Sequence, residues 1–219
     1  MASVDDLVRA LRDPDGHARG RAAQALLTLR DRRAVPLLAE ALRDDDDGVQ
    51  QLAARILGEL GDPAAADALV AALDDPRGAA TREVVIALGS IKAMAAIDGL
   101  IRALAHRDDA VRTVAAWAVG ELKASPAVAA LLEAVHDGVG RVRAAAAKAL
   151  GDIKDPGAVP ALIAALGDRH ADVRQNAAWA LGELRDPRAT EALSAILNDS
   201  DPTARRLAGQ SLKKLRSAR

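Results

Sequence analysis

The sequence lacks cysteine, phenylalanine and tyrosine, and only two of its 219 residues, Trp117 and Trp179, carry a large aromatic ring. Without cysteine the chain has no disulfide bond, no thiol nucleophile and no thiolate metal site. No apolar run approaches the roughly 20 residues of a membrane-spanning helix. The first residues, MASVDDLVRALRD, also lack the basic and then apolar order of a signal peptide. We therefore expect a cytoplasmic protein with no membrane partner.

An excess of charge of either sign is also missing, since 30 Lys and Arg face 31 Asp and Glu and the formal net charge is −1. A protein that neutralises a phosphate backbone carries a basic excess, so we expect no nucleic-acid partner. Half of the residues are hydrophobic, which excludes a disordered chain. Because large rings are nearly absent, the core has to be built from Ala, Leu, Val and Ile, and such a core favours closely packed helices.

A repeat with a period of 31 residues runs through the whole chain. Aliphatic residues recur at this interval without a slip, as Leu11, Leu42, Leu73, Leu104, Val135, Leu166 and Leu197, and so do the glycines Gly58, Gly89, Gly120, Gly151 and Gly182. Seven units fit the sequence, at about residues 1–30, 31–61, 62–92, 93–123, 124–154, 155–185 and 186–219. Because no residues are left over, the sequence predicts a single repeat domain over residues 1–219.

Each unit contains two helical patterns joined by a short polar turn. In the unit that begins at Asp155, this residue suits an N-cap and Pro156 suits the first helical position. Apolar residues then share one face of a first helix, at Val159, Leu162, Ile163 and Leu166, and one face of a second helix that starts near Ala171, at Val173, Ala177, Ala180, Leu181 and Leu184. A hairpin of two such helices cannot cover its own apolar surface. The sequence therefore predicts an all-α fold, an α-solenoid of seven stacked helical hairpins.

The glycine row indicates that the second helices approach one another closely. A glycine inside a helix costs about 1 kcal/mol relative to alanine, so five of them in register indicate a packing requirement. At the same position the first unit has Leu27 and the last has Lys213. This difference is expected if only the internal units have crowded neighbours on both sides.

The segments AVPALIAALGD and DVRQNAAWALGEL, with Pro36 and Pro160 in the first helices, resemble HEAT repeats. The resemblance is to the short bacterial HEAT-like type first named from phycobilin lyase subunits, and to engineered HEAT-like binding scaffolds. It implies a ladder in which turn aspartates pair with helix arginines along the stack. The matching residues are Asp13, Asp44, Asp75, Asp137, Asp168 and Asp199, and Arg19, Arg112, Arg143, Arg174 and Arg205; the rows are interrupted at His106, Gln50 and Thr81. We interpret these charges as helix caps and pairs between repeats.

In HEAT-type stacks the second helices line the concave side, so the resemblance places a contact surface on their outward positions. In the helix around Trp179 this residue points about 150° away from the apolar stripe, at 100° per residue. The same position holds Gln24, Arg55, Ile86, Trp117, Lys148, Trp179 and Gln210 along the chain. Because tryptophan is enriched at binding hot spots, we predict a partner-binding surface there, made of Arg55, Arg82, Ile86, Thr113, Trp117, Lys148, Gln175 and Trp179. The alternative is that each ring lies flat over neighbouring small residues and only adds packing.

No pattern in the sequence indicates catalysis. The histidines His17, His106, His136 and His170 lie in or beside turns of different units and are not spaced as metal ligands. HEAT-type iron hydroxylases carry His-Glu pairs after the Val-Arg position, and none occurs here. The run from Asp44 to Asp47 lacks the ligand spacing of a calcium loop. We therefore expect no catalytic residue, no metal and no cofactor.

The sequence predicts a non-catalytic scaffold that binds a protein or peptide on the concave face formed by the second helices. Two alternatives remain open from the resemblance. The chain is either a bilin lyase or isomerase subunit that acts with a phycobiliprotein, or an engineered repeat scaffold with no natural role. We expect a monomer, with self-association through the N-terminal end as the alternative.

Overall fold

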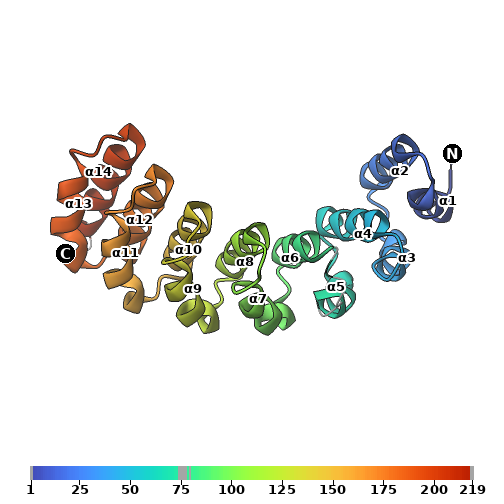
Figure 1. The fold of residues 1–219 in the computed structure, drawn as a ribbon, viewed down its shortest axis with the longest axis horizontal. Helices are drawn as coiled ribbons and strands as arrows, with labels where there is room; N and C mark the ends of the chain where they lie inside the picture. The colour runs from blue at the N-terminus through green and yellow to red at the C-terminus, as the bar shows by residue number, and fades with distance from the viewer. Residues whose placement is uncertain (1, 74–77, 79, 218–219) are drawn as a thin grey trace. The chain divides into compact units, whose positions relative to one another are not determined.

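The computed structural model describes residues 2–73, 78 and 80–217, and these residues form helices and turns without a strand (Figure 1). The chain divides into two compact units, Met1–Leu100 and Ile101–Arg219, and the boundary falls within helix α7 (Ile97–Ala103). The first unit contains α1 (Val4–Arg9), α2 (Gly16–Leu29), α3 (Ala34–Ala41), α4 (Asp47–Leu60), α5 (Ala66–Leu73) and α6 (Thr81–Ser90). The second contains α8 (Asp109–Glu121), α9 (Val128–Ala134), α10 (Gly140–Ile153), α11 (Val159–Ala165), α12 (Ala171–Leu184), α13 (Thr190–Ile196) and α14 (Pro202–Arg216). The predicted all-α solenoid is confirmed.

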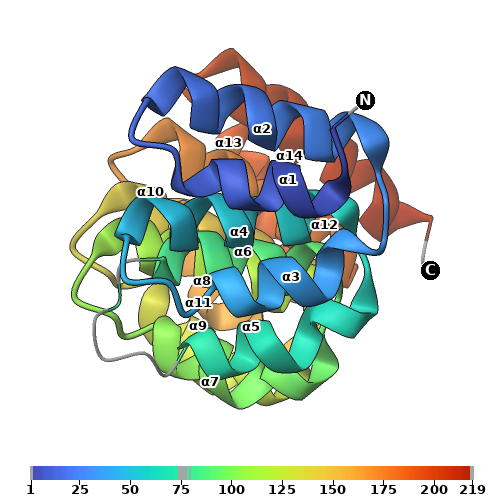
Figure 2. The ribbon, with the colours of Figure 1, turned by 90° about the vertical axis from the view of Figure 1, so that its right-hand side faces the viewer.

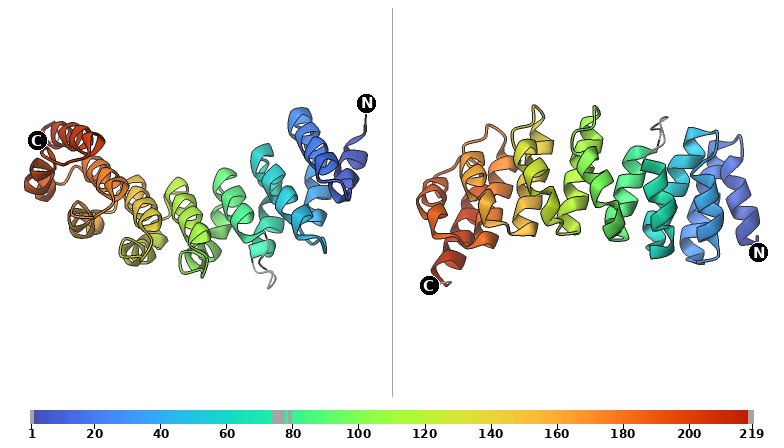
Figure 3. Two further views of the ribbon diagram at one scale, coloured as in Figure 1. Left: turned by 45° about the horizontal axis from the view of Figure 1, so that its top comes forward. Right: turned by 90° about the horizontal axis from the view of Figure 1, so that it is seen from below.

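Within each unit the helices form two layers. In the first unit α4 and α6 lie side by side above α3 and α5, and in the second unit α8, α10 and α12 lie above α9 and α11 (Figures 1 and 3). Figure 2 shows the layers of the first unit from the end of the molecule. The even-numbered helices are the second helices of the predicted hairpins. Their outward sides form the surface on which the sequence places the binding residues.

The first helices begin differently from the prediction. Asp155 is the N-cap that the sequence predicts, because its side chain accepts a hydrogen bond of 2.7 Å from the Gly157 N–H. The next residues, Pro156–Ala158, form a 3-10 turn before α11 starts at Val159. Four further 3-10 turns precede the first helices, at Pro63–Ala65, Met94–Ala96, Ser125–Ala127 and Pro187–Ala189, and another, Ala10–Arg12, follows α1. In this tighter turn the Ala158 N–H donates a hydrogen bond to the Asp155 carbonyl, three residues earlier. The spacing of apolar residues does not distinguish such a turn from the first turn of an α-helix.

The predicted aliphatic row forms part of the core. Leu11, Leu42, Leu104, Val135 and Leu166 are all at most 6% exposed. Leu197, the member in the last repeat, is instead 43% exposed. Leu73 is half-buried. Burial of the other five aliphatic residues shows how an Ala-rich chain closes a core without large rings.

The glycine row marks the closest approaches between successive second helices. A Cβ placed on Gly58 would lie 2.9 Å from the Cα of Ala87, and one on Gly151 would lie 2.7 Å from the Cα of Ala180. In both pairs the neighbour is an alanine 29 residues further along the chain. The predicted packing requirement is therefore confirmed, and it is met by glycine opposite alanine at Gly58, Gly120 and Gly151 and by glycine opposite Ser211 at Gly182.

Replacing Gly58 by alanine is expected to destabilise the protein by about 1–3 kcal/mol. The added methyl group collides with backbone in α6, and this overpacking outweighs the gain of about 1 kcal/mol in helix propensity. The matched control is Gly20→Ala in α2, where a Cβ would meet nothing within 4 Å. This control should gain about 0.5–1 kcal/mol. Urea unfolding measures both, and a stabilised Gly58→Ala variant would contradict the close approach.

Candidate partner-binding face

The second helices of the second unit present an outward surface that we call the tryptophan face, made of Thr113, Trp117, Lys148, Gln175 and Trp179. Lys148 is exposed, whereas both tryptophans are half-buried. The prediction that the tryptophan position points largely outward is therefore wrong in degree. The Trp179 side chain extends over α10. Its Cζ3 atom lies 2.7 Å from the position that a Cβ on Gly151 would occupy. Gly151 thus makes room both for Ala180 and for an indole ring.

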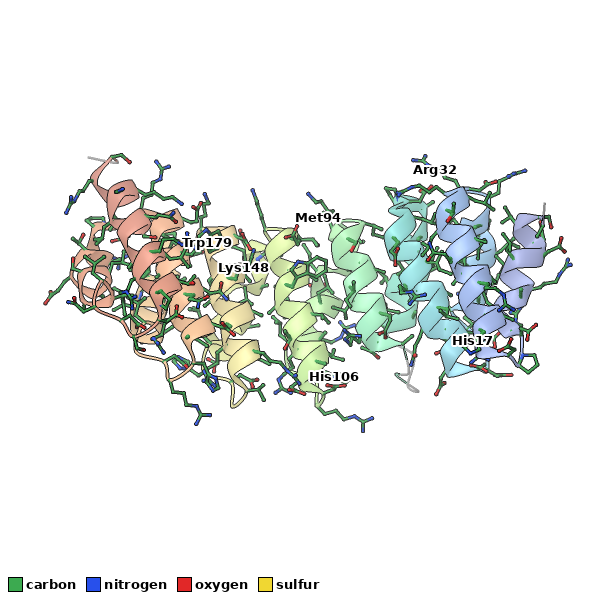
Figure 4. The ribbon with its side chains drawn as sticks, turned by 90° about the horizontal axis from the view of Figure 1, so that it is seen from above. His17, Arg32, Met94, His106, Lys148 and Trp179 are labelled. Carbon is green, nitrogen blue, oxygen red and sulfur yellow. The ribbon has the colours of Figure 1, made fainter. Side chains whose placement is uncertain are left out.

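The Lys148 side chain lies beside the Trp179 ring (Figure 4). Its Nζ lies 5.2 Å from the ring centroid, within the range of a cation–π interaction. The same Nζ donates a hydrogen bond of 2.7 Å to Asp152 Oδ2, four residues further along α10. The indole is therefore held between a glycine and a lysine that is itself fixed by a carboxylate. This arrangement gives the ring one defined position with part of its surface in solvent.

The polar members of the tryptophan face are already engaged within the unit. Thr113 donates a hydrogen bond of 2.7 Å to the Asp109 carbonyl, and Gln175 donates one of 2.9 Å to Asp201 Oδ1. Asn176, which the sequence analysis did not single out, donates to the Ala144 carbonyl at 3.1 Å. A bond between α12 and α10 at this level fixes the spacing of the two helices beside the tryptophan. Its only signal in the sequence is an amide in an otherwise apolar stretch.

The remaining predicted binding residues, Arg55, Arg82 and Ile86, lie on the first unit. Arg55 is exposed and lines a cleft of about 410 Å³ together with Gly16, Arg19, Gly20, Gly48, Gln51, Leu52 and Glu83. Arg82 pairs with Glu83 at 3.0 Å, and Ile86 is half-buried. Leu27 and Ile56 occupy the positions that hold glycine and alanine where later helices meet.

The ladder implied by the family resemblance is present in the second unit. It consists of bidentate pairs from arginine Nε and Nη2 to an aspartate 25 residues further along, with Nε–Oδ2 distances of 2.8 Å for Arg112–Asp137, 2.6 Å for Arg143–Asp168 and 2.7 Å for Arg174–Asp199. The Nη1 group of each arginine also donates to a main-chain carbonyl six residues before it, as from Arg143 to Asp137 at 2.8 Å. Each turn aspartate therefore connects the arginines of two successive repeats.

The ladder changes where the sequence interrupts the rows. Gln50 keeps the main-chain bond, from its Nε2 to the Asp44 carbonyl at 2.9 Å, and Thr81 donates to the Gly78 carbonyl. His106 replaces an aspartate in the turn bond before α8, because its Nδ1 accepts from the N–H of the N-cap residue Asp108 at 3.1 Å. Asp44 pairs with Arg12 at 2.5 Å, a residue outside the predicted rows. The predicted member Asp75 lies outside the described residues.

The ladder arginines alter the ionisation of their partners. Bidentate hydrogen bonding from Arg112 and Arg143 lowers the pKa values of Asp137 and Asp168 below their ordinary range. Arg174 has the largest effect and lowers the pKa of Asp199 to about 2. Elsewhere, hydrogen bonds from Lys154 and Lys214 lower the pKa of Glu183. Each of these carboxylates accepts hydrogen bonds from basic side chains, which favour its charged form and lower its pKa.

Nothing in the described part of the chain assembles a metal site or a membrane segment. No group of three or more His, Asp or Glu side chains there could hold a metal ion. A cleft of about 470 Å³ at the turns of the second unit is lined by His136 and Arg169, but its other charged groups, Asp137, Arg143 and Asp168, are ladder residues. Among the described residues no helix is both long enough and apolar enough to cross a membrane.

These features define a class, a repeat scaffold built from stacked helical hairpins. The family model of HEAT repeats matches residues 4–86, 75–143 and 140–213, and the chain belongs to the HEAT-repeat family. No curated protein matches the chain.

Solved structures show the same fold at low sequence identity. The archaeal HEAT-like repeats protein from Thermococcus onnurineus NA1 is 16% identical with a TM-score of 0.69, over 99% of this chain and 98% of that one. The complex of CpcE and CpcF of phycocyanin lyase from Nostoc sp. PCC7120 is 22% identical with a TM-score of 0.63, over 98% and 95%. An engineered protein is 22% identical with a TM-score of 0.59, over 99% and 98%. These likenesses concern the fold.

Proposed function

We propose that this HEAT-repeat scaffold is non-catalytic and binds a protein or peptide on the outward face of its second helices, the side that the resemblance makes concave. The tryptophan face is its centre. One observation carries the proposal: the two large aromatic rings of the chain occupy one register, two repeats apart, and both remain partly in solvent. Aromatic side chains held in one position contribute contact area at little entropic cost, which is why they dominate binding hot spots.

The packing alternative and the binding proposal are compatible at Trp179. Its ring covers Gly151, as the packing alternative requires, but half-burial leaves surface for a partner. Lys148 strengthens this platform, because it lies over the ring and is anchored by Asp152. In the first unit, Arg55 in its cleft and Ile86 supply further contacts with the partner under the same proposal. Fold likeness to phycocyanin lyase and to an engineered protein supports no second function, since no feature of the face points to a pigment.

Replacing Trp117 and Trp179 together by alanine is expected to weaken binding at least thirtyfold, the effect of a hot spot worth 2 kcal/mol or more. Peptides would first be selected against the full-length protein from a random 12-residue library, and their dissociation constants measured by calorimetry. A Trp117→Leu, Trp179→Leu variant keeps apolar cover on Gly151 and separates binding from stability.

The matched control for this experiment is His136→Ala with Arg169→Ala, two exposed residues at the turns of the second unit. The control should bind the selected peptides as the unchanged protein does. Circular dichroism should show the same helical signal for all variants. Selected peptides that bind the double alanine variant with unchanged affinity would refute the proposed face.

A further inference from the structure

The two units carry opposite net charges although the whole chain is nearly neutral. Residues 1–100 contain 12 Lys and Arg against 17 Asp and Glu, a net charge of −5, and residues 101–219 contain 18 against 14, a net charge of +4. Such asymmetry between parts of a chain indicates a charged partner for at least one of them. The question is where the surplus of the second unit lies.

The surplus gathers at the C-terminal ends of the second helices. This basic rim consists of Lys123, Lys154 and Arg185, which follow α8, α10 and α12, and of Lys213, Lys214 and Arg216 in the last turn of α14. The first three recur at the 31-residue period and therefore lie at the same edge of successive repeats. The turns that hold Arg107 and Arg169 lie at the opposite ends of the same helices.

Three residues of the rim have a strained backbone conformation. Lys123, Lys154 and Arg185 have φ values of 49°, 63° and 54°, in the left-handed region that glycine occupies without cost. In the first unit the same register holds Gly61, with a φ of 69° and no strain, but also Arg30 and Lys92, with φ values of 48° and 55°. The favourable field at a helix C-terminus explains the sign of the charge, but it does not require a side chain at this position.

Internal ion pairs engage two cations of the rim, Lys154 and Lys214, and leave the other four available. Glu183 accepts hydrogen bonds from both Lys154 and Lys214, Asp152 pairs with Lys148, and Asp186 pairs with Arg188. Among the described residues, Lys123, Arg185, Lys213 and Arg216 have no hydrogen bond or ion pair from their side chains. Glu121 is the unpaired acid nearby. The edge therefore presents four cations without an internal partner, in addition to the paired Lys154 and Lys214.

We propose that the basic rim of the second unit binds an acidic, extended segment of the polypeptide partner. This inference rests on the proposed function, and it adds that the polypeptide partner contains an acidic segment. Repeats that stack at about 10 Å place one cation beside every third residue of an extended chain, at about 3.3 Å per residue. Six residues separate Trp117 from Lys123, about 9 Å along a helix, so one partner spans the tryptophan face and the rim.

The rim fits carboxylates better than a nucleic-acid backbone. Asp155 and Asp186 directly follow Lys154 and Arg185 and cap the 3-10 turns there, so the positive potential is interrupted after two of the three repeating rim cations. A phosphate backbone carries continuous charge and favours an uninterrupted basic groove with aromatic stacking. An acidic peptide carries its carboxylates at intervals, so that its uncharged residues lie beside Asp155 and Asp186.

The test uses the full-length, 15N-labelled protein and acetylated octaglutamate at low salt. We expect saturable shifts of the amide resonances around Lys123, Lys154 and Arg185. Lys123→Glu with Arg185→Glu should weaken binding at least tenfold. Arg107→Glu with Arg169→Glu makes the same change in net charge at the opposite edge and should weaken it less than threefold. Lys123→Gly with Arg185→Gly relieves the strained backbone and should also lose affinity, which excludes unfolding as the cause.

Three outcomes would overturn the proposal. They are equal losses in the two charge-reversed proteins, shifts concentrated at the turns, and tighter binding of a twelve-residue thymidine oligonucleotide than of octaglutamate at the rim. The Trp117→Ala, Trp179→Ala protein should bind octaglutamate within twofold of the unchanged protein. Failure at the tryptophan face and failure at the rim are thereby distinguished, because each leaves the other measurement intact.

Discussion

Replacing Arg143 by methionine is expected to destabilise the protein by about 3 kcal/mol. Its side chain is 10% exposed and makes a bidentate pair with Asp168 as well as a bond to the Asp137 carbonyl. Methionine preserves the apolar stem but removes the Arg143 donor to the Asp137 carbonyl and leaves the nearly buried Asp168 carboxylate with the His170 N–H as its remaining donor. Removing one partner of a buried pair costs about 3–5 kcal/mol, more than the net value of the pair, and partial access of water here favours the lower figure.

The matched control is Arg141→Met, two residues earlier in α10. Arg141 also pairs with an aspartate, Asp109, but its side chain is 59% exposed. Exposed pairs contribute about 0–1 kcal/mol, so this variant should unfold nearly as the unchanged protein does. Adding Asp168→Asn to Arg143→Met should recover part of the loss, because the unpaired charge disappears. Equal urea midpoints for the two methionine variants would show that the ladder contributes no more than a surface pair.

The ladder was predictable as two rows of residues but not as a network. The 31-residue period aligns arginines with aspartates, and the resemblance pairs them along the stack. Neither the period nor the resemblance indicates that the Nη1 group of each ladder arginine donates to a carbonyl of the preceding turn, because every residue has a main-chain carbonyl and the sequence does not single one out. Gln50 looked like a simple interruption, yet it retains that main-chain bond. Arg12, outside the rows, takes the carboxylate of Asp44.

The position of the tryptophans was predictable, whereas their burial was not. A helical wheel fixes the direction of the Cα–Cβ bond, and an indole extends far enough to fold back onto a neighbouring helix. Trp179 does so because Gly151 offers no side chain in its way. Ala144, which lies in the same 31-residue register as Thr113 and Gln175, is buried for the complementary reason, since a methyl group is too short to emerge between packed helices.

Helix ends were the least predictable part of the chain. Glycine is the expected residue in the left-handed position after a helix, and the sequence has it there at Gly61. Basic residues take the same backbone conformation at Arg30, Lys92, Lys123, Lys154 and Arg185. Two of them reach the following repeat, Lys154 to Glu183 at 2.7 Å and Arg30 to the Glu59 carbonyl at 3.4 Å. Contacts between repeats thus compensate the strain in part, which local propensity does not reveal.

The coupling between Arg174 and Asp199 is expected to disappear at low pH. Arg174 lowers the pKa of Asp199 to about 2, whereas an aspartate in an unfolded chain titrates near 3.9. The unfolded chain therefore takes up this proton first as the pH falls. The stabilisation by the pair is complete above about pH 4 and is lost as the pH falls through the folded value near 2.

A double-mutant cycle with Arg174→Met and Asp199→Asn isolates this pair from the other carboxylates of the chain. At pH 7 we expect a coupling of about 2 kcal/mol, because the side chain of Asp199 is 7% exposed and that of Arg174 is 13% exposed. Urea unfolding at steps between pH 5 and pH 2 should show the coupling constant above pH 4 and reduced by at least half at pH 2. A coupling that does not change over this interval would show that Asp199 titrates as it does in the unfolded chain. The same cycle on Arg141 and Asp109 should give less than 1 kcal/mol at pH 7, because that pair is exposed.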